Sequence, residues 1–279
     1  MLRRRIEYEG AFYHVIQRGN NREHIFRKEI DKQSYLSKLV DLKKQLGFKL
    51  FGYVLMDNHY HLLLQTFKDP LHKIIFSQNM FYSRYFNNKY QRSGHLYGDR
   101  YKASLIQDER YLFAVLRYIH WNPVKAGLVK SPEEFAWSSD RVYRSNKNKE
   151  VDIDFILNIL SSKRQEALVA YVKQMKPDDD HVDFETKKII GDSDFIESIQ
   201  INKVDQEIHS GRISLDELLR NTGVSDLDYA LIRGGSRKRH LKTYKELYMK
   251  NARKHGYSYR EIGEYINLSD SAVGLYLSE

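Results

Sequence analysis

The sequence has 279 residues, of which 41% are hydrophobic, and it carries a formal net charge of +9 at pH 7. No apolar run approaches the roughly 20 residues needed to cross a bilayer, and the N-terminal MLRRRIEYEG lacks the apolar segment of a secretory signal. The absence of cysteine excludes disulfides, thiolate zinc sites and cysteine catalysis, and it fits a reducing cytoplasm.

The first part of the sequence predicts alternating strands and helices. In chain order we expect a strand over 12–18, a helix over 31–46, strands over 48–56 and 59–66, a helix over 71–90, a strand over 95–106 and a helix over 108–121. We expect a bulge at Gly98 in the fourth strand, and Pro123 should stop the last helix. This order matches a ferredoxin-like split βαβ plan, an α+β fold whose antiparallel sheet has its helices on one face.

Charge is spread unevenly, and it suggests three parts. Residues 1–145 hold 25 Lys and Arg against 14 Asp and Glu, residues 146–230 hold 11 against 18, and residues 231–279 hold 10 against 5. We expect a catalytic α+β domain over 1–145, an acidic helical connector over 146–200 and a helical DNA-binding domain over 201–279. Clustered cations neutralise phosphates, so the basic blocks favour a nucleic acid partner over a generically basic protein.

The C-terminal part predicts short helices around a tight turn. Ser258 and Glu261 fit a capping box at the start of one helix, Asn267 is expected to end it, and Ser269 can cap the next. Two such helices suit a helix-turn-helix that binds DNA. An ordinary helical hairpin is the alternative, although residues 231–260 hold ten Lys and Arg against the single acid Glu246.

His59 and His61 form the most distinctive pair in the sequence. Alternate residues of a strand point to the same face, so both imidazoles should project together. Two imidazoles on one face can share a metal ion. Isolated pairs of this kind are more often hydrogen-bonded than metal-bound, and both interpretations stay open on the pair alone.

A second candidate lies in the helix that follows. Tyr118 and Asn122 are four residues apart, a spacing that places them on one helix face. Tyr118 is a potential nucleophile, and Asn122 offers a carbonyl oxygen suited to a hard ion such as Mg²⁺ or Mn²⁺. Because Asn122 precedes Pro123, we expect it to leave helical geometry. The alternative makes Tyr118 a core aromatic and Asn122 a helix end.

Four segments together give the sequence a family resemblance. In this order and spacing, YHVIQRGNNREHIF, FGYVLMDNHYHLLL, HLYGDRYKASLI and RYIHWNPVKAGLV resemble the HUH single-tyrosine transposases, in particular the REP-associated tyrosine transposases. The resemblance covers about the first half of the chain. This sequence has Asp57 where the family usually has proline and Tyr60 where it usually has an aliphatic residue, and neither change removes a ligand. The tail is similar to the helix-turn-helix of chromosomal replication initiators.

The resemblance implies a reaction and its residues. It assigns His59, His61 and Asn122 to a divalent metal, Mg²⁺ or Mn²⁺, and Tyr118 to nucleophilic attack on single-stranded DNA. The product is a 5′-phosphotyrosine with a released 3′-hydroxyl, which can reverse the step and join strands. Family members recognise imperfect DNA hairpins beside single-stranded guide sequences, so single-stranded and hairpin DNA are the implied partners. His120 lies on a different helix face from Tyr118 and is not expected to be a ligand.

Basic residues near the predicted strands and in the C-terminal part are candidates for DNA contacts. They are Arg18, Arg22, Arg100, Lys102, Arg237, Lys238 and Arg239. Each is also consistent with a solvated surface charge. Three alternatives for the whole protein stay open: a replication initiator or relaxase of the same superfamily, a metal-dependent hydrolase, and an inactive DNA-binding regulator derived from a transposase. The expected state is a monomer or a homodimer.

Overall fold

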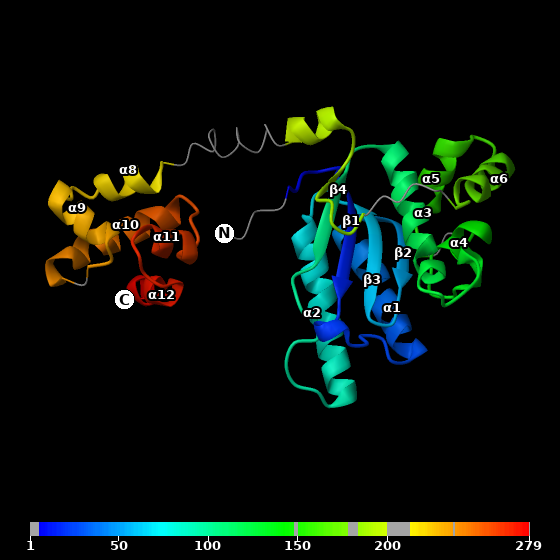
Figure 1. Cartoon of the computed structure of the whole chain (residues 1–279), viewed down its shortest axis with the longest axis horizontal. Coiled ribbons are helices and arrows are strands. Elements are labelled where there is room, and N and C mark those ends of the chain that lie inside the picture. The colour runs from blue at the N-terminus through cyan, green and yellow to red at the C-terminus, as the bar shows by residue number, and fades with distance from the viewer. Residues whose placement is uncertain (1–5, 148–149, 178–183, 200–212, 237, 279) are drawn as a thin grey trace. The chain divides into compact units, whose positions relative to one another are not determined.

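The computed structural model describes residues 6–147, 150–177, 184–199, 213–236 and 238–278. The chain divides into two compact units, Met1–Gln200 and Ile201–Glu279 (Figure 1). The predicted connector, 146–200, falls within the first unit, and its Asp178–Asp180 lie outside the described residues. Within the described ranges, no helix combines the length and hydrophobicity that crossing a bilayer requires.

Unit 1 is built on a five-stranded sheet with the strand order β2-β3-β1-β4-β5. The strands are β1 (Phe12–Arg18), β2 (Lys49–Leu55), β3 (His59–Gln65), β4 (Lys102–Ile106) and β5 (Ile189–Ile190). The first four pair antiparallel, whereas β5 runs parallel to β4 at the edge of the sheet. The predicted α+β class and split βαβ order are therefore confirmed, and β5 is an addition that the sequence did not predict.

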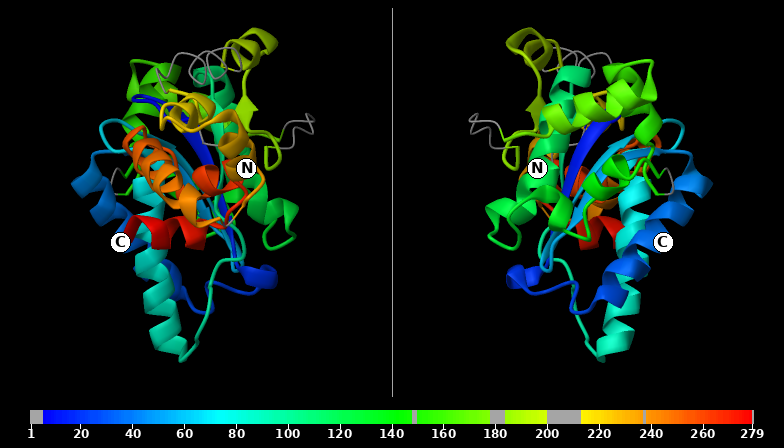
Figure 2. Two further views of the ribbon diagram at one scale, coloured as in Figure 1. Left: turned by 90° about the vertical axis from the view of Figure 1, so that its left-hand side faces the viewer. Right: turned by 90° about the vertical axis from the view of Figure 1, so that its right-hand side faces the viewer.

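Helices cover both faces of this sheet. The helices α1 (Glu29–Leu46) and α2 (Leu71–Tyr90) lie side by side on one face (Figure 2), where Tyr60 contacts the Tyr35 ring and donates to Asn79 Oδ1 at 2.7 Å. The helix α3 (Glu109–Lys125) lies on the opposite face. The expectation that all helices share one face is therefore wrong for α3, which follows the split βαβ unit.

Gly52 of β2 allows α3 to approach the sheet closely. A Cβ atom at this position would lie 2.6 Å from Leu116 Cδ1, a separation that a side chain could not occupy without moving its neighbour. A register shift between Leu50 and Gly52 marks the same part of β2 as irregular. A glycine thus occupies the position in β2 against which Leu116 of α3 packs.

Two predicted boundaries are wrong. The strand expected over 95–106 is only β4, and Gly98 lies outside any strand. Before β4, the Gln17 side chain donates to the Asp99 carbonyl at 3.0 Å, and Gly19 and Tyr97 form only an isolated bridge. The helix α3 also continues through Pro123, and Asn122 is helical. Pro123 has no N–H to donate to the Ile119 carbonyl, so α3 lacks this one main-chain bond two residues before it ends.

Short helices follow α3 within unit 1. They include α4 (Asp140–Arg144), α5 (Ile153–Leu160) and α6 (Arg164–Gln174). Their apolar residues, among them Ile153, Ile156 and Ala167, belong to the same buried cluster as the sheet. These helices therefore add to the core of the first unit.

Unit 2 is an all-α unit with a core of its own. Its helices are α8 (Leu215–Arg220), α9 (Asp226–Arg233), α10 (Lys242–Lys254), α11 (Tyr259–Tyr265) and α12 (Asp270–Ser278). Ser258 and Glu261 form the predicted capping box, and Ser269 Oγ accepts from the Ala272 N–H at 3.2 Å. Asn267, in the turn between α11 and α12, has a φ of 54°. The predicted helices are present, and their role as a DNA-binding helix-turn-helix stays a prediction.

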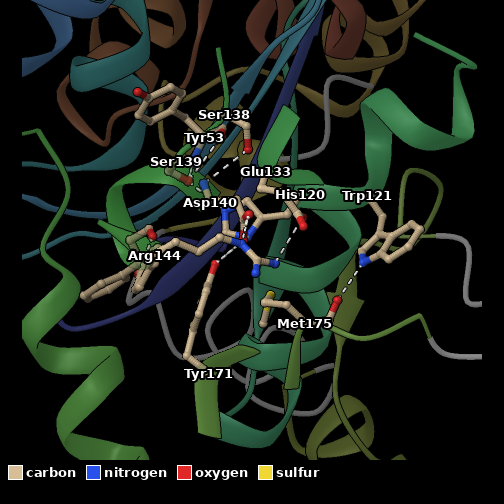
Figure 3. A network of polar contacts seen from close by, with 12 residues as sticks. Tyr53, His120, Trp121, Glu133, Ser138, Ser139, Asp140, Arg144, Tyr171 and Met175 are labelled. Atoms are coloured by element: carbon tan, nitrogen blue, oxygen red, sulfur yellow. Dashed lines mark hydrogen bonds and ion pairs between the residues drawn. The ribbon is translucent and has the colours of Figure 1, made fainter. Parts of the chain in front are cut away.

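A buried polar network holds α3 through His120 (Figure 3). Burial lowers the pKa of His120 to about 4, so the neutral ring carries one proton at pH 7. His120 Nε2 lies 2.8 Å from Ser139 Oγ, and its Nδ1 lies 3.0 Å from the Tyr171 hydroxyl. Tyr171 in turn donates to Asp140 Oδ1 at 2.7 Å.

One arrangement of protons keeps the bond from Tyr171 to Asp140. In it the Ser139 hydroxyl donates to His120 Nε2 in place of the Tyr53 carbonyl, which lies 3.2 Å away, the His120 Nδ1–H donates to the Tyr171 oxygen, and Tyr171 donates to Asp140. Arg144 Nε, 2.6 Å from Asp140 Oδ2, balances the buried carboxylate. The network thus ties α3 to α4 and α6 through side chains that are buried away from water.

We expect Tyr171→Phe to lower the free energy of unfolding of unit 1 by about 1–3 kcal/mol, because it leaves the His120 N–H and the Asp140 carboxylate without their shared partner. Denaturant unfolding followed by tryptophan fluorescence measures this, since Trp121 and Trp137 both belong to unit 1. The exposed Tyr8 provides the control variant Tyr8→Phe. Equal stabilities of the two variants would contradict the network's role.

Candidate active site

The two histidines of β3 lie on the same face of the sheet, as strand alternation predicts. His59 is paired across the strands with Arg18, and His61 is paired with Ile16. The two rings lie 5.1 Å apart between centroids and are nearly perpendicular. His61 is fully buried, whereas His59 is partly exposed at the beginning of the strand. The pair therefore opens toward solvent on the His59 side.

Tyr118 of α3 lies over this face. Its ring centroid is 5.8 Å from that of His61, and the two rings meet edge to face. Its hydroxyl donates to Glu185 Oε1 at 3.1 Å, and Lys125 Nζ lies 5.0 Å from its ring centroid. The structure thus brings the tyrosine of the helix and the histidines of the sheet together, with the tyrosine half-buried.

Asn122 lies one helical turn beyond Tyr118 and reaches His59. Burial lowers the pKa of His59 to about 4, assisted by the positive charge of Arg18; Glu185 and the Asn122 side chain act in the opposite direction. Asn122 Nδ2 also lies 3.4 Å from the Tyr118 carbonyl oxygen. Because it remains helical, Asn122 keeps the same helix face as Tyr118.

The donor set fits a divalent cation. His61 Nε2 is buried and has no hydrogen-bond partner, and burial lowers the pKa of His61 well below its usual value, so the ring is neutral. His59 Nδ1 lies 2.6 Å from Asn58 Oδ1, and an N–H donated there leaves Nε2 with a free lone pair. Two neutral imidazoles and an amide oxygen suit Mn²⁺ or Mg²⁺.

No cluster of three or more His, Cys, Asp or Glu residues that could hold a metal is found among the described residues. The set of His59, His61 and Asn122 contains only two residues of those types. Asp57, which stands where the family usually has proline, accepts from Lys32 Nζ at 2.7 Å. The cation would therefore depend on a minimal set of protein ligands.

Sequence reasoning missed two residues of the site. His14 of β1 lies against His61, with 2.9 Å between His14 Nε2 and His61 Nδ1. Its signal was present, because His14 shares a predicted strand with Arg18 at even spacing. Glu185 contacts both Tyr118 and Arg18, the latter at 3.4 Å. No local pattern predicts this contact, since Glu185 lies 67 residues from Tyr118.

The basic residues predicted to contact DNA differ in their positions relative to the histidines and Tyr118. Arg18 faces the site and pairs with Glu185. The others in unit 1, Arg22, Arg100 and Lys102, are exposed. Lys238 and Arg239 are exposed in unit 2, and Arg237 lies outside the described residues. Only Arg18 among the described candidates is thus part of the histidine and tyrosine cluster.

Several solved structures are similar to the chain, and two of them are described as transposases. The first, described as a REP-associated tyrosine transposase bound to a REP hairpin, has a TM-score of 0.44 at 17% identity and covers 55% of this chain and 90% of its own. The second, a putative transposase from Deinococcus radiodurans R1, has a TM-score of 0.30 at 19% identity and covers 43% of this chain and 95% of its own.

Among curated proteins, none matches this sequence. Residues 7–122 match the family described as "Transposase IS200 like". The matched stretch includes β1, β3 and the part of α3 that carries Tyr118 and Asn122. The resemblance to transposases is thereby confirmed over residues 7–122, the stretch that matches this family.

Proposed function

We propose that this protein is a metal-dependent transposase that cleaves and rejoins single-stranded DNA through a covalent bond to Tyr118. One observation carries the proposal: the Tyr118 ring lies 5.8 Å from the His61 ring, over the sheet face that holds both histidines. The match of residues 7–122 to a transposase family supports it. We further propose DNA hairpins with flanking single strands as the substrate.

In this proposal His59, His61 and Asn122 hold Mg²⁺ or Mn²⁺, which supplies charge compensation at the scissile phosphate. Arg18 contributes a second positive charge beside His59. The helix α3 presents the Tyr118 hydroxyl, whose ordinary pKa near 10 makes it a weak nucleophile without such help. Attack forms the bond from the Tyr118 oxygen to phosphorus and breaks the bond from phosphorus to the 3′-oxygen, which leaves protonated.

The reverse reaction requires nothing more. The phosphotyrosine keeps the energy of the phosphodiester, so a 3′-hydroxyl that takes the place of the leaving strand restores a DNA backbone. Since the proton and the bond both return to their starting atoms, one tyrosine is sufficient for cleavage and joining. Neither cleavage nor joining requires a nucleotide cofactor in this mechanism.

Unit 2 is proposed to bind DNA as a separate domain. It exposes Lys238 and Arg239 ahead of α10, and α11 and α12 follow one another around the turn at Asn267. Contacts of such residues with phosphates supply affinity for DNA that does not depend on the base sequence. We propose that this unit increases the time that the catalytic unit spends on DNA. We further propose that the protein acts as a monomer or a homodimer.

We expect wild-type protein mixed with labelled hairpin DNA and Mn²⁺ to give a covalent adduct on a denaturing gel. Tyr118→Phe should abolish the adduct because it removes the attacking oxygen, and His59→Ala should reduce it at least 100-fold because it removes a ligand. The matched control is Tyr111→Phe, seven residues earlier in α3, which should retain the adduct.

The outcomes separate the proposal from its rivals. An adduct that survives Tyr118→Phe would refute Tyr118 as the nucleophile. DNA binding by the wild type without any adduct would favour the inactive regulator. Free cleaved DNA without an adduct would favour a hydrolase.

We expect Glu185→Gln to bind single-stranded DNA about five-fold more tightly, because a carboxylate 3.1 Å from the Tyr118 hydroxyl repels an incoming phosphate with an energy of about 1 kcal/mol. Fluorescence anisotropy at a fixed salt concentration measures the affinity. Glu166→Gln, at an exposed position in α6, is the control. Weaker binding by Glu185→Gln than by this control would contradict the expectation.

A further inference from the structure

Glu185 is held beside Tyr118 by contacts on both sides of it along the chain. The ring of its neighbour Phe184 is buried and meets the Tyr118 ring edge to face, with 5.3 Å between the two centroids. On the other side of Glu185, the Lys188 carbonyl accepts from the Leu105 N–H of β4 at 2.9 Å. Core packing and the edge of the sheet therefore hold the carboxylate next to the tyrosine.

The two oxygens of Glu185 contact two different groups of the site. Oε1 lies 3.1 Å from the Tyr118 hydroxyl, and Oε2 lies 3.4 Å from Arg18 Nη2. An ionised carboxylate has no hydrogen to donate, so the Tyr118 O–H points at Glu185 in this contact. The guanidinium of Arg18 balances the charge of the carboxylate from the other side. The hydroxyl hydrogen of Tyr118 thus lies between its own oxygen and a group that can accept it.

This contact meets the geometric requirement for a general base. When the Tyr118 oxygen attacks phosphorus, its O–H bond has to break. The group that takes the proton has to lie within hydrogen-bond distance of the tyrosine oxygen, at about 2.6–3.2 Å. Glu185 Oε1 satisfies this condition at 3.1 Å in the absence of DNA.

Other groups near Tyr118 are less suited to accept this proton. Lys125 Nζ lies 5.0 Å from the Tyr118 ring centroid, but a charged ammonium group has only donors. Its positive charge instead favours the negative charge that develops on the tyrosine oxygen. In the proposed function His59 and His61 bind the cation, so neither ring is available as the base.

We propose that Glu185 is a catalytic residue that accepts the proton of Tyr118 during DNA cleavage and gives a proton back during joining. This inference rests on the proposed function, because it presumes attack by Tyr118. In cleavage the Tyr118 O–H bond breaks and its proton moves to Glu185 Oε1, while the tyrosine oxygen bonds to phosphorus. The bond from phosphorus to the 3′-oxygen breaks, and water supplies the proton of the 3′-hydroxyl. The hydroxide left from that water takes the proton from Glu185, and joining runs through the same steps in reverse.

The same carboxylate then has opposite effects on DNA binding and on cleavage. Its negative charge repels an incoming phosphate, which is why Glu185→Gln is expected to bind more tightly, whereas its basicity assists the attack. Replacing the carboxylate with an amide should therefore improve binding and slow cleavage. Damage to the structure of the site would not separate the two quantities in this way, because it would weaken both.

We expect Glu185→Gln to form the covalent adduct at least 100-fold more slowly than the wild type, because an amide is not a base and a general base contributes about 10²–10⁴-fold to the rate. The rate is measured in a single turnover with Mn²⁺ and saturating labelled hairpin DNA that carries flanking single strands. The affinity of the variant for this DNA should equal or exceed that of the wild type. The control is Glu197→Gln, an exposed position in the same described range. A wild-type rate in Glu185→Gln would overturn the proposal.

Glu185→Ala tests the chemistry of the carboxylate in a second way. The side chain of Glu185 is 28% exposed, so its removal opens a space that solvent reaches. Formate that enters this space can accept the Tyr118 proton, and it should raise the rate of adduct formation by about ten-fold or more over chloride at the same ionic strength. Formate should not accelerate the wild type, and Tyr118→Phe should form no adduct with it. A slow Glu185→Ala that formate does not accelerate would overturn the proposal.

These outcomes distinguish the two proposals. A wild type that forms no adduct, or an adduct that survives Tyr118→Phe, would refute the proposed function and with it the role of Glu185. An adduct that requires Tyr118 and forms equally fast in Glu185→Gln would leave the proposed function intact and refute Glu185 alone. If Glu185→Ala does not fold, the rate and the DNA affinity of Glu185→Gln decide.

Discussion

The close packing of α3 on the histidine face of the sheet is the constraint on which the site depends. Gly52 permits the approach, and the His120 network fixes the helix from behind. Since Tyr118 and Asn122 are both on this helix, a small shift of α3 would move the proposed nucleophile and one proposed metal ligand together. The site's geometry is therefore set by residues that take no part in its chemistry.

Several features of this arrangement were predictable because they depend on local periodicity. Strand alternation placed His59 and His61 on one face, and helical spacing placed Tyr118 and Asn122 on another surface that could meet it. The resemblance to transposases then predicted that the histidine pair and the pair on the helix belong to one site. Asp108, Ser258 and Gly47 end or begin helices as their types suggest. Such signals lie within a few residues of the feature they determine.

Other features could not be predicted, because they depend on contacts between distant parts of the chain. Glu185 reaches Tyr118 from a segment that composition describes only as acidic. The segment before β4 pairs with Gly19 only through an isolated bridge at Tyr97, and the Asp99 carbonyl accepts from the Gln17 side chain. His14 is one histidine among eleven until the register of β1 and β3 places it against His61.

The edge strand β5 gives Glu185 its position, and this has a consequence for how the site changes state. The segment after Glu185 is attached to β4 by the Ser104 Oγ contact with Lys187 and by main-chain bonds from Leu105 to Lys188 and from Gln107 to Ile190. Detaching so short an edge costs far less than opening the core. The negative charge beside Tyr118 is thus held by a two-residue edge strand and by the buried side chains of Phe184 and Ile190, so a polyanion that displaces this segment would have to expose both side chains.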